Sequence, residues 1–291
     1  MPYFLALLFL LTVGMRFWAL GFISLDQDET ATGAWVHAQG LVDLYQNQIR
    51  TPFEGNAFGY PAIIYFWGWF AREPEWLRAL SALAGVATVF VFYFYYSRRL
   101  ARVPVLLATF LLSLSSAALL LSQNARVYSL YGLAVFVSFL FFQQSLAEPN
   151  RKRWLVAYAL AGAVSLYFHH LAFLYLGSFW ALGAWWVLRG RLPRQHLWAP
   201  LGTILLYLPH LPLLFYQMQN CPRWIPPISL WVVKFVMNFI TDMHHAYPTW
   251  LIWFFTGLGA IFAWRRRATP ELVWLVFPLA LGILLSGVHR D

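Results

Sequence analysis

The segment YFLALLFLLTVGMRFWALGFISLDQDE, residues 3–29, determines the class of this protein, because an apolar run leads directly into acidic residues. Residues 3–23 are long enough to cross a bilayer as a helix, and they carry a single charge, Arg16. Three carboxylates then follow within the four residues 26–29. The segment therefore predicts a membrane span that ends at an acidic site on the membrane surface.

The composition extends this interpretation to the whole chain of 291 residues. Hydrophobic residues make up 61% of the chain and charged residues only 11%, which is typical of a membrane protein rather than of a soluble domain. Aromatic residues make up 20%, and this excess fits belts of Trp, Tyr and Phe at both membrane surfaces. The single cysteine, Cys221, excludes an intramolecular disulfide and a cysteine metal cluster.

Nine apolar stretches alternate with polar connections along the chain. They are residues 3–23, 76–97, 104–121, 127–146, 154–168, 171–188, 197–216, 248–264 and 272–288. Twelve of the twenty Lys and Arg lie in every second connection, at Arg98, Arg99, Arg102, Arg151, Lys152, Arg153, Arg189, Arg191, Arg194, Arg265, Arg266 and Arg267. This alternation is the positive-inside pattern and predicts a cytoplasmic N-terminus. The net charge of +9 is then a consequence of topology, which excludes a nucleic-acid partner.

We therefore expect an all-α polytopic protein of the cell membrane, with about nine spans in one transmembrane domain, residues 1–291. The first stretch lacks the pattern of a cleaved signal peptide and is expected to be a retained span. Residues 24–75 and 217–247 form large extracytoplasmic loops in this topology. Within the first, GYPAIIYFWGWF (59–70) is short for a crossing and predicts a helix that lies in the membrane interface or docks on the spans. The apolar segment 229–243 is expected to stay outside.

Acidic, histidine and arginine residues gather on the outer side of the predicted topology. They are Asp26, Asp28, Glu29, Arg126, His169, His170, His210, His244 and His245, with Tyr128 next to Arg126. A one-sided collection of this kind predicts an active site that faces away from the cytoplasm. The adjacent histidines at 244–245 lack a third ligand nearby, so we predict no metal site.

Each of these residues also has a structural interpretation. Asp26 and Glu29 have the spacing of a helix N-cap and its N3 partner, and for this pair a capping box is the favoured interpretation. Asp28 would then either complement the helix dipole or act as a base. Arg126 is open to two interpretations, an interfacial snorkelling residue or a substrate contact. The histidines 169–170 are equally open to a place in the aromatic belt.

The stretch RFWALGFISLDQDE (16–29) resembles the start of the GT-C glycosyltransferases of the family 39 type, which include protein O-mannosyltransferases and lipid A aminoarabinose transferases. Similar stretches follow in the order of that family over most of the chain: PEWLRALSALAGVATVFVFYFYYSRRL (74–100), SQNARVYSLYGL (122–133), LYFHHLAFLYL (166–176) and WIPPISL (224–230). The chain departs from the family at Asn124, where many relatives carry Glu, and at Tyr60–Pro61, where Pro-Pro is usual. Relatives continue with further spans, so we expect a C-terminally truncated member.

The resemblance implies a GT-C-like bundle that transfers a sugar from a polyprenyl-phosphate donor to a protein, lipid or glycan acceptor. We expect the transfer to invert the configuration of the anomeric carbon. It implies that Asp28 is the general base and Glu29 supports it. The residues expected to bind substrate are Arg126, on the carrier phosphate, with Tyr128, His169 and His170. An arginine can stabilise a monophosphate leaving group by itself, so no cofactor is expected, and a divalent metal is compatible with the scheme but not required.

Two functions from other classes remain as alternatives. A lipid or solute transporter, such as a flippase, would need polar groups spread through the depth of the membrane. Arg16 is the only charge well inside a predicted span, which counts against transport. The second alternative is a noncatalytic subunit of an envelope complex.

Overall fold

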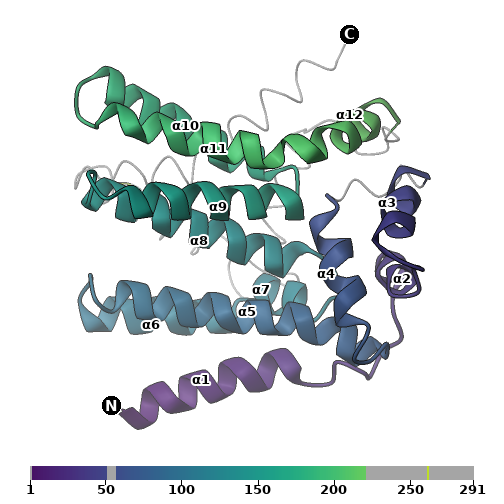
Figure 1. Ribbon diagram of the computed structural model, residues 1–291. Coiled ribbons are helices and arrows are strands. Elements are labelled where there is room, and N and C mark those ends of the chain that lie inside the picture. The colour runs from purple at the N-terminus through teal and green to yellow at the C-terminus, as the bar shows by residue number, and fades with distance from the viewer. Residues whose placement is uncertain (1, 51–56, 221–260, 262–291) are drawn as a thin grey trace. The chain divides into compact units, whose positions relative to one another are not determined.

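The computed structural model describes residues 2–50, 57–220 and 261, and all regular structure in these residues is helical (Figure 1). This confirms the expected all-α class for the part of the chain that is described. The chain divides into two compact units, Met1–Phe136 and Val137–Asp291. It passes from the first to the second within α8 (Tyr128–Ala147).

The first unit is built around a group of apolar helices that lie side by side in Figure 1. These are α1 (Pro2–Phe17), α5 (Pro74–Tyr96), α6 (Arg102–Leu114) and α7 (Ser116–Ser122). The ring of Phe9 on α1 packs against Phe90 and Tyr93 on α5, with centroid distances of 4.1 and 5.5 Å. Aromatic packing of this kind joins α1 to α5.

Three short helices lie beyond one end of α1 and α5 (Figure 1). They are α2 (Gln27–Trp35), α3 (Leu41–Arg50) and α4 (Gly59–Trp67). The helix expected in residues 59–70 is therefore present, and it docks on the bundle by burying Tyr60 and Ile64. Trp67 at its end stacks on Trp76 with a centroid distance of 4.6 Å, and each indole N–H donates to the carbonyl of the other residue.

The second unit contains a close pair of helices joined by small residues. Its elements after α8 are α9 (Lys152–Phe168), α10 (Ala172–Leu188), η1 (Arg194–Leu197), α11 (Trp198–Tyr207), η2 (Leu208–His210) and α12 (Leu211–Asn220). Gly162 on α9 faces Thr203 on α11, whose hydroxyl donates to the carbonyl of Ala159 at 3.1 Å. Small residues at the contact let the two backbones approach closely, as in many membrane helix pairs.

The expected count of nine spans is not reached in the described residues. Three helical segments are long and apolar enough to cross a membrane, at residues 74–96, 128–147 and 194–220. A fourth is added if α6 and α7, which are bent by 54° at Ser115, count as one span. Helix α1 stops at Phe17, short of the expected residue 23, and α9 and α10 have 17 residues each. The stretches 229–243 and 272–288, and the stretch 248–264 apart from residue 261, lie outside the described residues.

The early end of α1 and the break after α6 leave backbone carbonyls without helical partners, and each region supplies donors to the other. The buried guanidinium of Arg16 on α1 donates to the carbonyl of Ser113 at 3.2 Å, near the end of α6. The amide of Gln123, after α7, donates to the carbonyls of Met15 and Trp18 at 2.7 and 3.2 Å. Arg16 is therefore held by carbonyls, and no carboxylate of the described residues forms an ion pair with it.

Gly85 on α5 allows this close packing, which leads to a first prediction. A Cβ atom at Gly85 would clash with the Ser122 hydroxyl and lie 3.0 Å from Nε of Arg16. We expect Gly85→Ala to lower the free energy of unfolding by about 1–3 kcal/mol, the usual effect of overpacking a buried contact. The free energy can be measured by denaturant unfolding of the purified protein in detergent micelles.

The matched control is Gly132→Ala on α8, where an added Cβ meets nothing within 4 Å. That change should be neutral or stabilise by up to about 1 kcal/mol, because alanine favours helix over glycine. Equal effects of the two substitutions would contradict a tight contact at Gly85.

Candidate functional site

The acidic residues of the 26–29 cluster begin helix α2. Asp26 is the N-cap, and its side chain accepts a hydrogen bond from the backbone N–H of Glu29 at 2.7 Å. The Glu29 side chain in turn accepts from the backbone N–H of Asp26 at 3.1 Å. This reciprocal pair confirms the capping box that the spacing predicts. It also fixes the direction in which the next residues of the cluster point.

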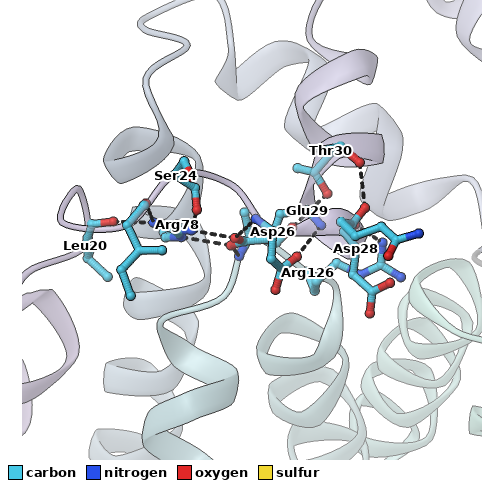
Figure 2. Close-up of polar contacts among 12 residues, drawn as sticks. Leu20, Ser24, Asp26, Asp28, Glu29, Thr30, Arg78 and Arg126 are labelled. Carbon is cyan, nitrogen blue, oxygen red and sulfur yellow. Dashed lines mark hydrogen bonds and ion pairs between the residues drawn. The ribbon is translucent and has the colours of Figure 1, made fainter.

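Glu29 forms a buried ion pair with Arg78 near the start of α5. The Glu29 side chain is almost fully buried, and Nε of Arg78 donates to its Oε1 at 2.8 Å. A second bond joins the NH2 group of Arg78 to Oε2 at 2.5 Å. The other bonds from Arg78 go to the carbonyls of Leu20, Ile23 and Ser24. Figure 2 shows Arg78 between the 20–24 segment and Glu29, so this one guanidinium joins the end of the first apolar segment to α2.

The Glu29 carboxylate also binds the connection between α7 and α8. The backbone N–H of Ala125 donates to Oε1 of Glu29 at 2.6 Å, and the carbonyl of Ala125 accepts from the hydroxyl of Thr32 at 2.7 Å. Both backbone groups of Ala125 are thus paired with side chains of α2. The carbonyl of Arg126 accepts from the hydroxyl of Ser81 on α5 at 3.0 Å. Residues 125–126 are consequently fixed against two helices.

The environment of Glu29 favours its ionised form. Burial alone would raise the pKa of its carboxyl, but the hydrogen bonds from Arg78, Ala125 and Asp26 and the charge of Arg78 outweigh burial and lower the pKa. The carboxylate already has donors on both oxygens, and its role in supporting Asp28 stays a prediction.

Asp28 points elsewhere, because adjacent residues on a helix are turned by about 100° from each other. Its side chain is exposed in the first turn of α2, whereas that of Glu29 is buried. The guanidinium of Arg126, which is only 9% exposed, donates to the backbone carbonyl of Asp28 at 2.5 Å. Figure 2 shows the two residues side by side. The structure therefore brings together two predicted site residues that are 98 positions apart in the sequence.

Three residues near this pair were not among the predicted site residues. Arg78 appeared only as part of the Leu-Arg start of the segment 74–100. Tyr60 is buried on α4 close to the hydroxyls of Thr32 and Ser81, and burial raises the pKa of its phenol. The side-chain oxygen of Asn124 is buried and accepts no hydrogen bond in the structure as described. Tyr60 and Asn124 are positions at which the sequence departs from the resembling family, and that departure was the available signal.

Three predicted site residues remain: Tyr128, His169 and His170. Tyr128 begins α8 and is 38% exposed. His169 ends α9 in the second unit, where its Nδ1 accepts from the backbone N–H of Leu171 at 3.2 Å. His170 binds two groups of the same unit, the hydroxyl of Tyr207 at Nδ1 and the side-chain oxygen of Gln217 at Nε2, both at 2.8 Å. A pocket shared by Arg126 with either histidine stays a prediction.

Burial favours the neutral form of the His170 ring. The side-chain oxygen of Gln217 can only accept, so Nε2 of His170 carries the proton and Nδ1 accepts from the Tyr207 hydroxyl. Burial lowers the pKa of His170, although the bond to Gln217 acts in the opposite direction. Within residues 2–50, 57–220 and 261, no group of three or more His, Cys, Asp and Glu side chains is arranged to hold a metal ion.

The buried pair leads to a second prediction. Glu29→Gln keeps the shape of the side chain but leaves the charge of Arg78 buried without its counter-ion. We expect a loss of about 3–5 kcal/mol in the free energy of unfolding, as is usual when one member of a buried pair is removed. The contribution of an ionised Glu29 is fully present above the ordinary pKa near 4.5 and is lost as the pH falls through the lowered pKa of the folded protein. The difference between the two proteins should therefore shrink in acid.

The control is Glu148→Gln, because Glu148 forms an exposed pair with Arg151 at 2.7 Å. Pairs at the surface contribute little to stability, so this variant should unfold almost as the unmodified protein does. The same denaturant titration serves both variants. A loss at Glu29 as small as that at Glu148 would show that the buried pair does not hold α2 in place.

Comparison with known proteins does not identify a family for this chain. No model of a protein family matches the chain, and no curated protein matches it significantly.

Proposed function

We propose that this chain is a membrane glycosyltransferase that moves a sugar from a polyprenyl-phosphate donor to a protein, lipid or glycan acceptor. The observation that supports the proposal most is the pairing of Asp28 with Arg126 at the end of the apolar helices of the first unit. An exposed carboxylate can remove a proton, and a neighbouring guanidinium can bind a phosphate. These are the two groups that such a transfer needs.

The proposed reaction uses each group once. The Asp28 carboxylate takes the proton of the acceptor hydroxyl while the hydroxyl oxygen attacks the anomeric carbon. The bond between that carbon and the phosphate oxygen breaks on the opposite face, and the electron pair leaves with the polyprenyl phosphate. Arg126 stabilises the negative charge that this phosphate gains. A single displacement of this kind inverts the configuration at the anomeric carbon.

The hydrogen bonds to the Glu29 carboxylate support the proposal because catalytic groups must be held in place before substrate binds. Arg78 and Ala125 both bind the Glu29 carboxylate, so α2, which carries Asp28, and the 125–126 backbone, which carries Arg126, share one anchor. The side-chain oxygen of Asn124, two residues before Arg126, is a buried acceptor that a sugar hydroxyl could satisfy.

The wider parts of the proposal rest on the resemblance described for the sequence. They are a GT-C-like bundle of about nine spans, an active site on the extracytoplasmic side of the cell membrane, and a role in building the cell envelope or in protein glycosylation. Tyr128 and one of His169 and His170 would line the donor pocket. The described helices support a membrane protein, and these finer features are proposals.

A transporter is the second candidate, because two features of the first unit favour it. The helix pair α6–α7 is broken by 54°, and the guanidinium of Arg16 lies buried beside the break. Broken helices with buried polar groups are common at the substrate sites of transporters. Incubation of the purified protein with a radiolabelled polyprenyl-phosphate sugar and an acceptor preparation separates the two functions. A transferase releases free polyprenyl phosphate, and a transporter leaves the donor intact.

The third prediction concerns the base. Asp28→Asn keeps the shape of the side chain and removes its ability to accept a proton. We expect the rate of donor turnover to fall by roughly two to four orders of magnitude, the usual contribution of a general base. Release of polyprenyl phosphate from labelled donor measures this rate.

The matched control is Asp26→Asn, two residues away in the same cluster. Asn is a good N-cap residue, so this variant should keep its activity and lose at most about 1 kcal/mol of stability. If Asp26→Asn were inactive and Asp28→Asn active, Asp28 would not be the base.

The fourth prediction concerns the leaving group. Arg126→Lys keeps the positive charge but loses the planar fork that suits a phosphate, so we expect weaker donor binding and slower transfer. Titration of donor lipid into the purified protein measures the affinity, and membrane insertion and expression should stay near normal. If the variant and the unmodified protein bound the donor with equal affinity, Arg126 would not be the phosphate-binding residue. Its role would then be that of an interfacial anchor.

A further inference from the structure

Within residues 137–220 of the second unit, the positive charge lies in two short stretches around helix ends, one at the start of α9 and one after α10. All six Lys and Arg of residues 137–220 lie there, at Arg151, Lys152, Arg153, Arg189, Arg191 and Arg194. All six side chains are exposed. The same range contains one acidic residue, Glu148, so six positive charges and one negative charge give a net charge of +5. We call the six residues the basic patch.

Hydrogen bonds hold the two loops of the basic patch together. The side-chain amide of Gln195 donates to the carbonyl of Pro149 at 2.6 Å. The ring of His196, which is buried, lies with its Nε2 3.2 Å from the carbonyl of Ser145. The loop that precedes α9 and the loop that follows α10 are therefore joined at one end of this unit. The six charges therefore lie on two stretches of chain that are in contact with each other.

Aromatic rings fix two of the guanidinium groups. The guanidinium carbon of Arg153 lies 4.6 Å from the ring centroid of Trp154, and that of Arg189 lies 4.4 Å from the ring centroid of Trp185. The indole N–H of Trp154 donates to Glu148 at 3.2 Å, which holds the ring. A ring covers one face of a guanidinium and leaves the N–H groups at its edge to bind acceptors such as phosphate oxygens.

The charges at the start of α9 are not arranged to stabilise that helix, whereas Arg189, at the C-cap of α10, lies at a helix end where a cation is favourable. Cations are unfavourable at the positive end of a helix dipole, yet the first turn of α9 contains Lys152 and Arg153 and no acid. Arg151 at the N-cap makes no side-chain capping bond. One charge of the patch is balanced by a carboxylate, since Arg151 pairs with Glu148 at 2.7 Å. Helix capping therefore does not account for Lys152 and Arg153 at the start of α9, whose position on one side of the membrane the positive-inside pattern predicts.

We propose that the basic patch binds the phosphate headgroups of anionic phospholipids. Its loops join apolar helices, and Trp154 and Trp185 at the helix ends are residues typical of the level of the headgroups in a membrane. Lys and Arg at that level attract anionic lipids, with each one near the surface contributing about a fivefold gain in affinity. The proposal does not depend on the glycosyltransferase function, because none of its residues belongs to the Asp28–Arg126 site.

The test compares lipid binding by variants of the full-length chain purified in detergent. Phosphatidylglycerol or phosphatidylcholine is titrated in, and bound lipid is counted by native mass spectrometry. The double variant Arg153→Gln with Arg189→Gln should bind phosphatidylglycerol about 25-fold more weakly than the unmodified protein, since two charges are lost. Binding of phosphatidylcholine should not change. The affinity for phosphatidylglycerol should fall as salt is raised, because salt screens exposed charges.

The matched control is Arg98→Gln with Arg102→Gln, which removes the same charge from exposed residues of the first unit. It should weaken phosphatidylglycerol binding by less than about fivefold, the effect of one surface charge. If both double variants lost the same affinity for phosphatidylglycerol, the affinity would depend only on the total charge of the protein. That result would overturn the proposal. It would also be overturned if phosphatidylcholine bound as well as phosphatidylglycerol, or if inorganic phosphate competed with the lipid at equal concentration.

Discussion

The buried ion pair of Glu29 and Arg78 is the interaction on which the first unit depends. Arg78 binds the Glu29 carboxylate and three carbonyls of residues 20–24, and the same carboxylate binds the backbone of Ala125. Four segments of the chain thus meet at one pair of charges. Moving two charges from water into a low-dielectric interior costs desolvation free energy, and the attraction within the buried pair often does not exceed that cost. What this pair provides is a defined position for α2 against α5 and the 122–126 connection.

That position separates the roles of two adjacent carboxylates. Glu29 faces inward and is held by donors on both oxygens, whereas Asp28 faces outward beside Arg126. A helix makes this separation necessary, because neighbouring side chains cannot face the same point. The inward carboxylate fixes the geometry of α2, and the outward one is the base in the transfer that we propose. The proposed transferase needs both, since a base on a loosely held helix would lose most of its advantage.

Local patterns in the sequence predicted the local features of the fold. The Asp26–Glu29 spacing gave the capping box, the two long apolar runs gave α5 and α8, and the short aromatic run 59–70 gave a docked helix. Features that depend on distant residues were not predictable in this way. The break at Ser115 lies inside a stretch that was predicted as one span, although Ser113, Ser115 and Ser116 interrupt its apolar residues and Ser115 caps α7. Helix α1 ends within another apolar run, where Ala19 adopts φ +56°. The partners of Arg78 and Arg126 come from segments far away along the chain.

The mutual bonding of α1 and the α6–α7 region has a consequence for the order of assembly in the membrane. Helix α1 is made first, but the amide that satisfies its carbonyl at Met15 belongs to Gln123, 108 residues later. Arg16 likewise finds the carbonyls of Leu112 and Ser113 only when α6 has been made. In a medium without water, a lone α1 would carry an unneutralised cation and unsatisfied carbonyls. Helix α1 therefore lacks some of its hydrogen-bond partners when it is made. It acquires them only after more than a third of the chain has entered the membrane.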